Sequence, residues 1–143
     1  MKNDLAIIYI EKPIEFNEKI KPACMPKTEI TFGSTCYASG WGNIKDIKDK
    51  DQERPENLMT APLYIFNKTE CYKDALKENG NLTNQMFDSF YDELIPGAIC
   101  ASNRPKSICK GDSGGPFICE ENGKAVIRGI ASGLINVGMW SKK

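Results

Sequence analysis

Short apolar runs separated by polar, proline-containing segments characterise the first half of the chain. Residues 5–10 are a continuous apolar run of strand length that ends in charge and proline, which predicts a buried strand. Residues 11–30 carry prolines among charged side chains and favour an extended connector over a helix. Residues 31–42 are rich in Thr, Phe, Cys and Tyr and predict another strand, which closes on a Gly-Trp-Gly turn.

The second half alternates in the same way and adds one helix signal. Residues 43–57 are almost wholly polar and predict a solvated loop without a binding site, whereas residues 58–66 return to a strand pattern. Asn67 with Glu70 three residues later is a variant capping box, which predicts a short helix to about residue 77. Two further strands, 117–119 and 125–132, are predicted around an Asn-Gly hairpin turn, so the fold class is all-β with one short helix.

Composition narrows the range of functions. The 143 residues suit one domain, the formal net charge is zero, and no basic tract or membrane-length apolar run occurs. We therefore expect no nucleic-acid and no membrane partner. Six cysteines favour an oxidising compartment, although reduced structural cysteines in a cytosolic protein remain an alternative. The chain has no histidine and no Cys-x-x-Cys motif, so we expect no metal.

One candidate for chemistry lies near the C-terminal end, in residues 110–116. Ser113 stands between glycines and follows Asp112. Glycine lets the main chain approach a ligand closely, and such a loop can aim two N–H groups at a developing oxyanion. Ser113 is then a candidate nucleophile, with the N–H groups of Gly111 and Ser113 as the oxyanion hole; a flexible Gly/Ser turn is the alternative.

The run from Cys109 to Cys119 resembles the nucleophile signature of the chymotrypsin/trypsin serine endopeptidases. Other segments resemble that family in the same order: 3–8 the strand of the triad aspartate, 20–26 the link between the barrels, 39–42 the opening of the second barrel, and 97–101 the strand before the specificity loop. The resemblance implies a second β-barrel of the two-barrel chymotrypsin-like fold plus the last part of the first barrel. Residues 1–22 would be a remnant of the first barrel and the linker, 23–134 an incomplete second barrel, and 135–143 an unmatched tail.

The resemblance also implies roles for single residues. Ser113 matches the nucleophile, and Asp4 matches the aspartate that orients the catalytic histidine. Ser132 matches the serine whose hydroxyl supports that aspartate, on a strand that would pair with the substrate backbone. Asp112 matches the carboxylate that receives the new N-terminal ammonium when the zymogen is activated.

A specificity pocket and covalent features follow from the same resemblance. Ser107 falls at the pocket base, where a neutral residue favours apolar or aromatic substrate side chains. The other implied pocket residues are Ile108, Ser132, Gly133 and Leu134, and Leu134 would favour small side chains. The implied disulfides are Cys36–Cys119 and Cys71–Cys100, with partners for Cys24 and Cys109 outside the chain. Sequons at Asn67 and Asn81 are candidate glycosylation sites.

The missing histidine decides the expectation for activity. A serine hydroxyl without an adjacent base is a poor nucleophile at neutral pH. Asp112 also lacks an ammonium partner, so we expect its loop to relax.

We therefore expect a secreted serine-type endopeptidase by family, needing no cofactor, whose isolated chain is inactive. Its partners would be a protein or peptide substrate and a complementary N-terminal protease chain. The first residues are no secretory signal, and Met1 is expected to mark an internal start, a truncated gene model or a fragment. A non-catalytic homologue acting as a secreted binding or regulatory module is the alternative, and an unrelated all-β protein is a third.

Overall fold

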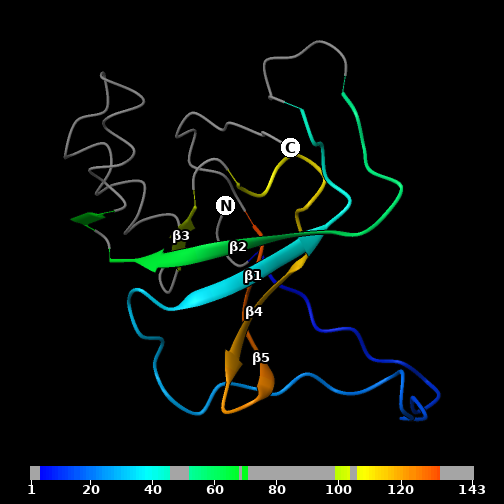
Figure 1. Ribbon diagram of the computed structural model, residues 1–143. Coiled ribbons are helices and arrows are strands. Elements are labelled where there is room, and N and C mark those ends of the chain that lie inside the picture. The colour runs from blue at the N-terminus through cyan, green and yellow to red at the C-terminus, as the bar shows by residue number, and fades with distance from the viewer. Residues whose placement is uncertain (1–3, 46–51, 68, 71–98, 104–105, 133–143) are drawn as a thin grey trace.

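In the part of the chain that the structure describes, five antiparallel strands form one sheet in the computed structural model (Figure 1). The structure describes residues 4–45, 52–67, 69–70, 99–103 and 106–132. The strands are β1 (Thr35–Gly40), β2 (Met59–Phe66), β3 (Cys100–Ser102), β4 (Pro116–Glu121) and β5 (Lys124–Ile130). Their order across the sheet is β3-β2-β1-β4-β5. The all-β class is confirmed. None of the helices in the described part of the chain is long and apolar enough to cross a membrane.

The core lies on one face of β1, β2 and β4, because side chains alternate between the two faces of a strand. In β2, Leu63 and Ile65 are buried while Tyr64 between them is exposed. The buried cluster consists of Cys36, Ala38, Leu63, Ile65, Phe117 and Cys119. Cys36 lies directly opposite Cys119 in the β1–β4 register. This pair forms the implied disulfide, which is confirmed.

The turn between β4 and β5 has the expected chemistry. Asn122 has a φ of 52° and Gly123 a φ of 71°. Two consecutive residues at positive φ are typical of the primed turns that suit the twist of a β-hairpin. The predicted hairpin is confirmed.

The capping box at Asn67 is also present. The backbone N–H of Glu70 donates to Asn67 Oδ1 at 2.8 Å, and the backbone N–H of Asn67 donates to Glu70 Oε2 at 3.4 Å. The side-chain oxygen of Asn67, the asparagine of the first sequon, is therefore engaged as a helix cap. The rest of the predicted helix and the sequon at Asn81 lie outside the described residues.

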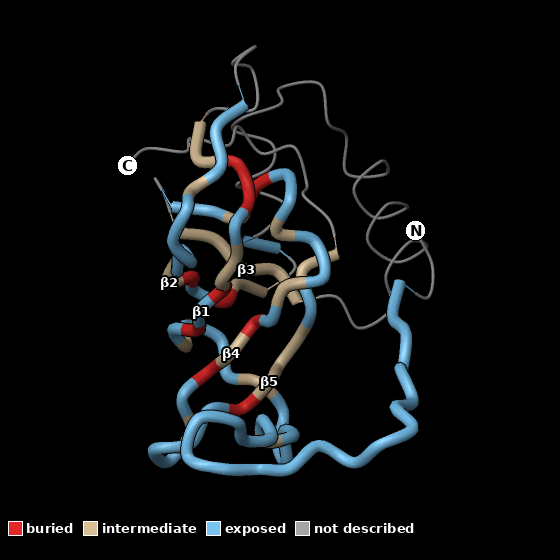
Figure 2. The backbone as a smooth tube through the Cα atoms, turned by 90° about the vertical axis from the view of Figure 1, so that its right-hand side faces the viewer, coloured by how far each residue is buried: buried red, intermediate tan, exposed pale blue. Residues whose placement is uncertain are grey.

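The prediction of a buried strand at residues 5–10 is wrong for this chain by itself. This segment forms no strand, and its apolar side chains are exposed, Ile8 to 83% and Tyr9 to 94%. The chain from residue 4 to residue 23 runs along the outside of the molecule (Figure 2). An apolar run of strand length needs a neighbouring strand to pair with, and none of the described strands lies beside it.

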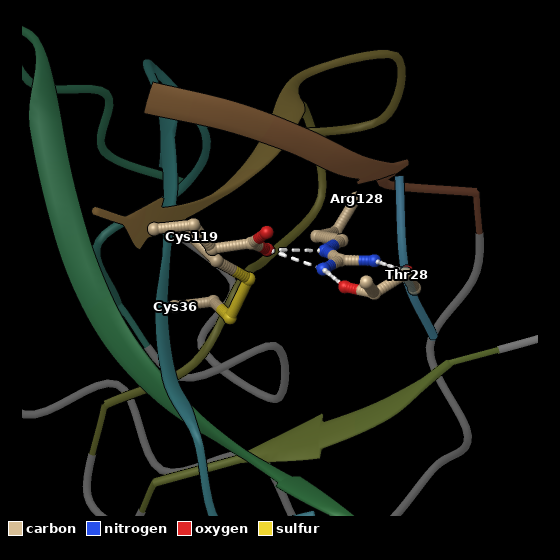
Figure 3. A network of polar contacts seen from close by, with 5 residues as sticks. Thr28, Cys36, Cys119 and Arg128 are labelled. Atoms are coloured by element: carbon tan, nitrogen blue, oxygen red, sulfur yellow. Dashed lines mark hydrogen bonds and ion pairs between the residues drawn. A yellow bond between two sulfur atoms is a disulfide. The ribbon is translucent and has the colours of Figure 1, made fainter. Parts of the chain in front are cut away.

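A polar network fixes the connector to the sheet close to the disulfide (Figure 3). Cys24 pairs with β5 through two backbone hydrogen bonds, to Ala125 and from Ile127. The side chain of Arg128 is only 7% exposed and forms an ion pair with Glu121 at 2.5 Å. The Arg128 guanidinium also donates to the backbone carbonyl of Thr28. These contacts hold residues 24–28 against β5.

Replacing Arg128 with Met should lower the free energy of unfolding by about 2–3 kcal/mol, because Glu121 and the Thr28 carbonyl both lose a donor. Urea unfolding followed by tryptophan fluorescence measures the change. The control is Lys124→Met, an exposed position at the start of the same strand, which should cost less than about 0.5 kcal/mol. Equal urea midpoints for the two variants would show that the network does not stabilise the fold.

The exposed apolar segment should make the isolated chain aggregate. Ile7→Lys combined with Tyr9→Lys, at positions 80% and 94% exposed, should raise the monomeric fraction measured by size exclusion with light scattering. The control Leu63→Lys places a charge at a buried position and should lower it. A wild-type chain that is monodisperse and melts cooperatively as a monomer would contradict this expectation.

Candidate active site

Two consecutive turns place Ser113 at the tip of the loop that precedes β4. The N–H of Asp112 donates to the Cys109 carbonyl at 3.0 Å, and the N–H of Gly115 donates to the Asp112 carbonyl at 2.9 Å. Gly111 and Gly114 have φ values of 104° and 84°, in the left-handed region that favours glycine. Ser113 is exposed at the tip of this loop.

Asp112 ties this loop to the end of β1. Its Oδ1 accepts the N–H of Gly42 at 2.8 Å, and its Oδ2 accepts the N–H of Cys109 at 2.8 Å. The sequence predicts that the loop relaxes without an ammonium beside Asp112, and the structure differs from that expectation. The carboxylate is only half-buried, and two backbone donors hold its oxygens. Hydrogen bonds to an ionised carboxylate are among the stronger ones in proteins.

The glycines of the Gly-Trp-Gly turn make room for this carboxylate. A Cβ built on Gly40 would lie 2.1 Å from Asp112 Oδ1, and one built on Gly42 would lie 2.5 Å from the same atom. Real Cβ atoms do not approach other atoms so closely. Sequence reasoning found this turn only as the opening of the second barrel. The turn also makes room for Asp112. The sequence signal for this role is the i, i+2 spacing of Gly40 and Gly42, which puts both on the face of the chain that meets Asp112.

The end of β5 holds the loop from the other side. The N–H of Gly114 donates to the Ala131 carbonyl at 2.7 Å, and the N–H of Ala131 donates to the Gly115 carbonyl at 2.9 Å. Ser132 follows directly, and its hydroxyl donates to Asp4 Oδ2 at 2.5 Å. The structure thus brings together Asp4 and Ser132, which are 128 positions apart, as the resemblance implies.

The implied specificity residues are only partly described. Ser107 is exposed, while Ile108 packs against the hydrophobic core cluster. Gly133 and Leu134 lie outside the described residues, and the shape of the pocket stays a prediction. Cys100 is disulfide-bonded, but its implied partner Cys71 also lies outside them.

Asn43 is a site residue that sequence reasoning missed. It is 5% exposed, and its backbone N–H donates to the Lys110 carbonyl at 2.9 Å. Its Oδ1 accepts the backbone N–H of Glu53 at 2.9 Å. Asn43 therefore joins the serine loop to the polar segment that the sequence predicts to be only solvated. An Asn directly after a Gly-Trp-Gly turn is a typical turn residue, and only the fold shows its partners.

These groups suit nucleophilic chemistry on a carbonyl more than metal chemistry. Among the described residues, no group of three or more His, Cys, Asp and Glu side chains is arranged to hold a metal ion. An exposed hydroxyl lies between glycines in a loop that is anchored on both sides. The Asp4 carboxylate and the Ser132 hydroxyl lie just past the end of β5. Ser132 directly follows Ala131, which makes the anchoring hydrogen bonds.

Comparison with known proteins places this arrangement in a family. The family model described as Trypsin matches residues 1–139. The chain is 35% identical over 91% of its length to kallikrein 1-related peptidase b8 of Mus musculus. It is 32% identical over 91% of its length to prostatic glandular kallikrein-6 of Rattus norvegicus, and 30% identical over 99% to kallikrein-1 of Mus musculus. The chain spans 42%, 42% and 52% of these three relatives, respectively. On this evidence the chain belongs to the trypsin family of serine proteases.

Proposed function

We propose that this chain carries the nucleophile half of a serine-type endopeptidase site. Ser113 is the nucleophile, and the N–H groups of Gly111 and Ser113 are the donors for the oxyanion. The supporting observation is the serine loop itself, which Asp112 and Gly42 hold on one side and Ala131 on the other while Ser113 stays exposed. Pre-organised donors of this kind stabilise the charge that develops when a serine attacks a peptide carbonyl.

The general base must come from another part of the enzyme. The chain has no histidine, and in the family's mechanism a histidine takes the proton from the serine and returns it to the leaving amine. Loss of that histidine lowers kcat by about a million-fold in another serine protease lineage. Asp4, held by the Ser132 hydroxyl, is the carboxylate that would orient the incoming base.

A complementary N-terminal protease barrel is the partner that fits the exposed segment. Residues 5–10 present apolar side chains on both faces of an extended chain, which suits a strand buried inside a second sheet. Such a barrel would also supply the histidine. We further propose that residues 1–22 belong with that barrel, while 23–134 form the second barrel.

The substrate is a protein or peptide, and the neutral Ser107 favours an apolar or aromatic side chain in the primary pocket. Secretion and a Cys71–Cys100 disulfide belong to the same proposal, since disulfides persist in oxidising compartments. A second candidate function is a non-catalytic homologue that binds its partner without cleaving it. The absence of histidine is the observation that favours this second candidate.

Labelling by a serine-directed fluorophosphonate separates the two candidates. The isolated chain should show no labelling and no peptide hydrolysis, because nothing deprotonates Ser113. Adding an N-terminal barrel that carries the family histidine should restore labelling, and Ser113→Ala should abolish it again. A complex that assembles but stays unlabelled would favour the non-catalytic homologue. Rapid cleavage by the isolated chain, lost in Ser113→Ala, would show that the base does not come from elsewhere.

Gly40→Ala should loosen the serine loop. The added methyl would overlap Asp112 Oδ1 and push the carboxylate off its two backbone donors. Hydrogen exchange by mass spectrometry should then show at least about tenfold faster exchange at the Gly42 and Cys109 amides, as expected for losing hydrogen bonds to a charged group. Gly129→Ala is the matched control, because its Cβ would meet nothing closer than 3.6 Å. Unchanged protection in Gly40→Ala would show that Asp112 does not need this space.

A further inference from the structure

Arg54 lies beside the serine loop, although it belongs to the polar segment before β2. A Cβ built on Gly111 would lie 3.7 Å from Arg54 Nη2 and 3.9 Å from Arg54 Cζ. The guanidinium therefore lies next to Gly111, the residue proposed to donate to the oxyanion. The neighbouring backbone is fixed, since the N–H of Ile44 donates to the Glu53 carbonyl at 2.9 Å and Asn43 accepts from the Glu53 N–H.

The charge of Arg54 is available to a ligand. Arg54 is exposed, and no carboxylate in the described ranges forms an ion pair with it. Its neighbour Glu53 is instead paired with Lys45, at 3.1 Å. A guanidinium presents several donors in a planar fork that matches a carboxylate. Arg54 is therefore suited to bind an acidic side chain of a ligand.

The side of the loop on which Arg54 lies decides what part of a substrate it meets. Ala131 anchors the loop on the side of Ser132, which lies just past the end of β5 and whose segment is expected from the family resemblance to pair with the substrate backbone. Gly42 and Arg54 lie at Gly111, at the opposite anchor of the loop. A peptide that crosses Ser113 from the Ser132 side therefore continues over Gly111 towards Arg54.

We infer that Arg54 is a specificity-determining residue that favours Asp or Glu in the part of a peptide substrate that lies next to the scissile bond on the Gly111 side of Ser113. This inference rests on the proposed function, because it takes the position of the scissile bond at Ser113 from it. Arg54 touches neither the nucleophile nor the base, so it acts on which peptides bind. An exposed ion pair contributes up to about 1 kcal/mol, which corresponds to about fivefold in affinity.

Peptide binding to the monomeric fraction of the full 143-residue chain, isolated by size exclusion, tests the inference without requiring hydrolysis. Two fluorescent ten-residue peptides are compared by anisotropy at low ionic strength, one with Glu-Glu-Phe-Glu-Glu and one with Gln-Gln-Phe-Gln-Gln at the centre. The wild-type chain should bind the Glu peptide about three- to fivefold more tightly, and the preference should shrink at high salt. Arg54→Gln should remove the preference, and Arg54→Lys should keep most of it. Lys124→Gln removes one positive charge at the start of β5, beside the hairpin turn, and should leave the preference unchanged.

The outcomes separate a failure of the role of Arg54 from a failure of the proposed peptidase site. Equal affinities for the two peptides, or a preference that survives in Arg54→Gln, would overturn the role of Arg54 and leave the proposed peptidase site standing. A preference that Lys124→Gln also removes would show that only the overall charge matters, which overturns it too. Binding of neither peptide to a folded wild-type chain would overturn the proposed substrate cleft, and the role of Arg54 with it.

Discussion

The geometry of the serine loop depends on the two hydrogen bonds that the Asp112 carboxylate accepts. One comes from Gly42 at the end of β1, and the other comes from Cys109 at the start of the loop itself. The carboxylate therefore joins segments 70 positions apart and fixes the direction of the chain on both sides of Ser113. Backbone donors cannot move away as a flexible side chain can, so the anchor costs little conformational entropy once the sheet has formed.

The sheet supplies the alignment on which that anchor relies. β1 and β4 pair with Cys36 opposite Cys119 and Ala38 opposite Phe117, and the disulfide joins them at the end away from the loop. The Gly40–Gly42 turn after β1 and the serine loop before β4 consequently lie at the same end of this strand pair. A displacement of one residue in this register would move side chains to the other face of β1 and would separate Gly42 from Asp112. The core residues and the site residues thus depend on the same strand pairing.

Local chemistry made much of this arrangement predictable. The hairpin at Asn122, the cap at Asn67 and strands β1 and β2 follow from short-range preferences that the fold does not override. The buried strand at residues 5–10 was predicted wrongly, because an apolar pattern indicates that a segment can be buried and does not indicate what covers it. Arg54 and Asn43 were missed for a related reason. Their polar segment has the composition of a solvated loop, and only the contacts across the fold place it beside Gly111.

The two sides of the site differ in how firmly they are held. The serine loop has donors and acceptors from the segments that follow β1 and β5. Among the described residues, Asp4 has a single hydrogen bond, with the Ser132 hydroxyl, and it sits on a segment without strand pairing. One exposed hydrogen bond contributes about 1 kcal/mol and cannot fix an extended segment by itself. A partner that buries residues 5–10 would order Asp4 at the same time as it delivers a base. In the proposed complex with an N-terminal barrel, the orientation of the base and the covering of the apolar segment would be one event, and the nucleophile side would already be built before the proton acceptor arrives.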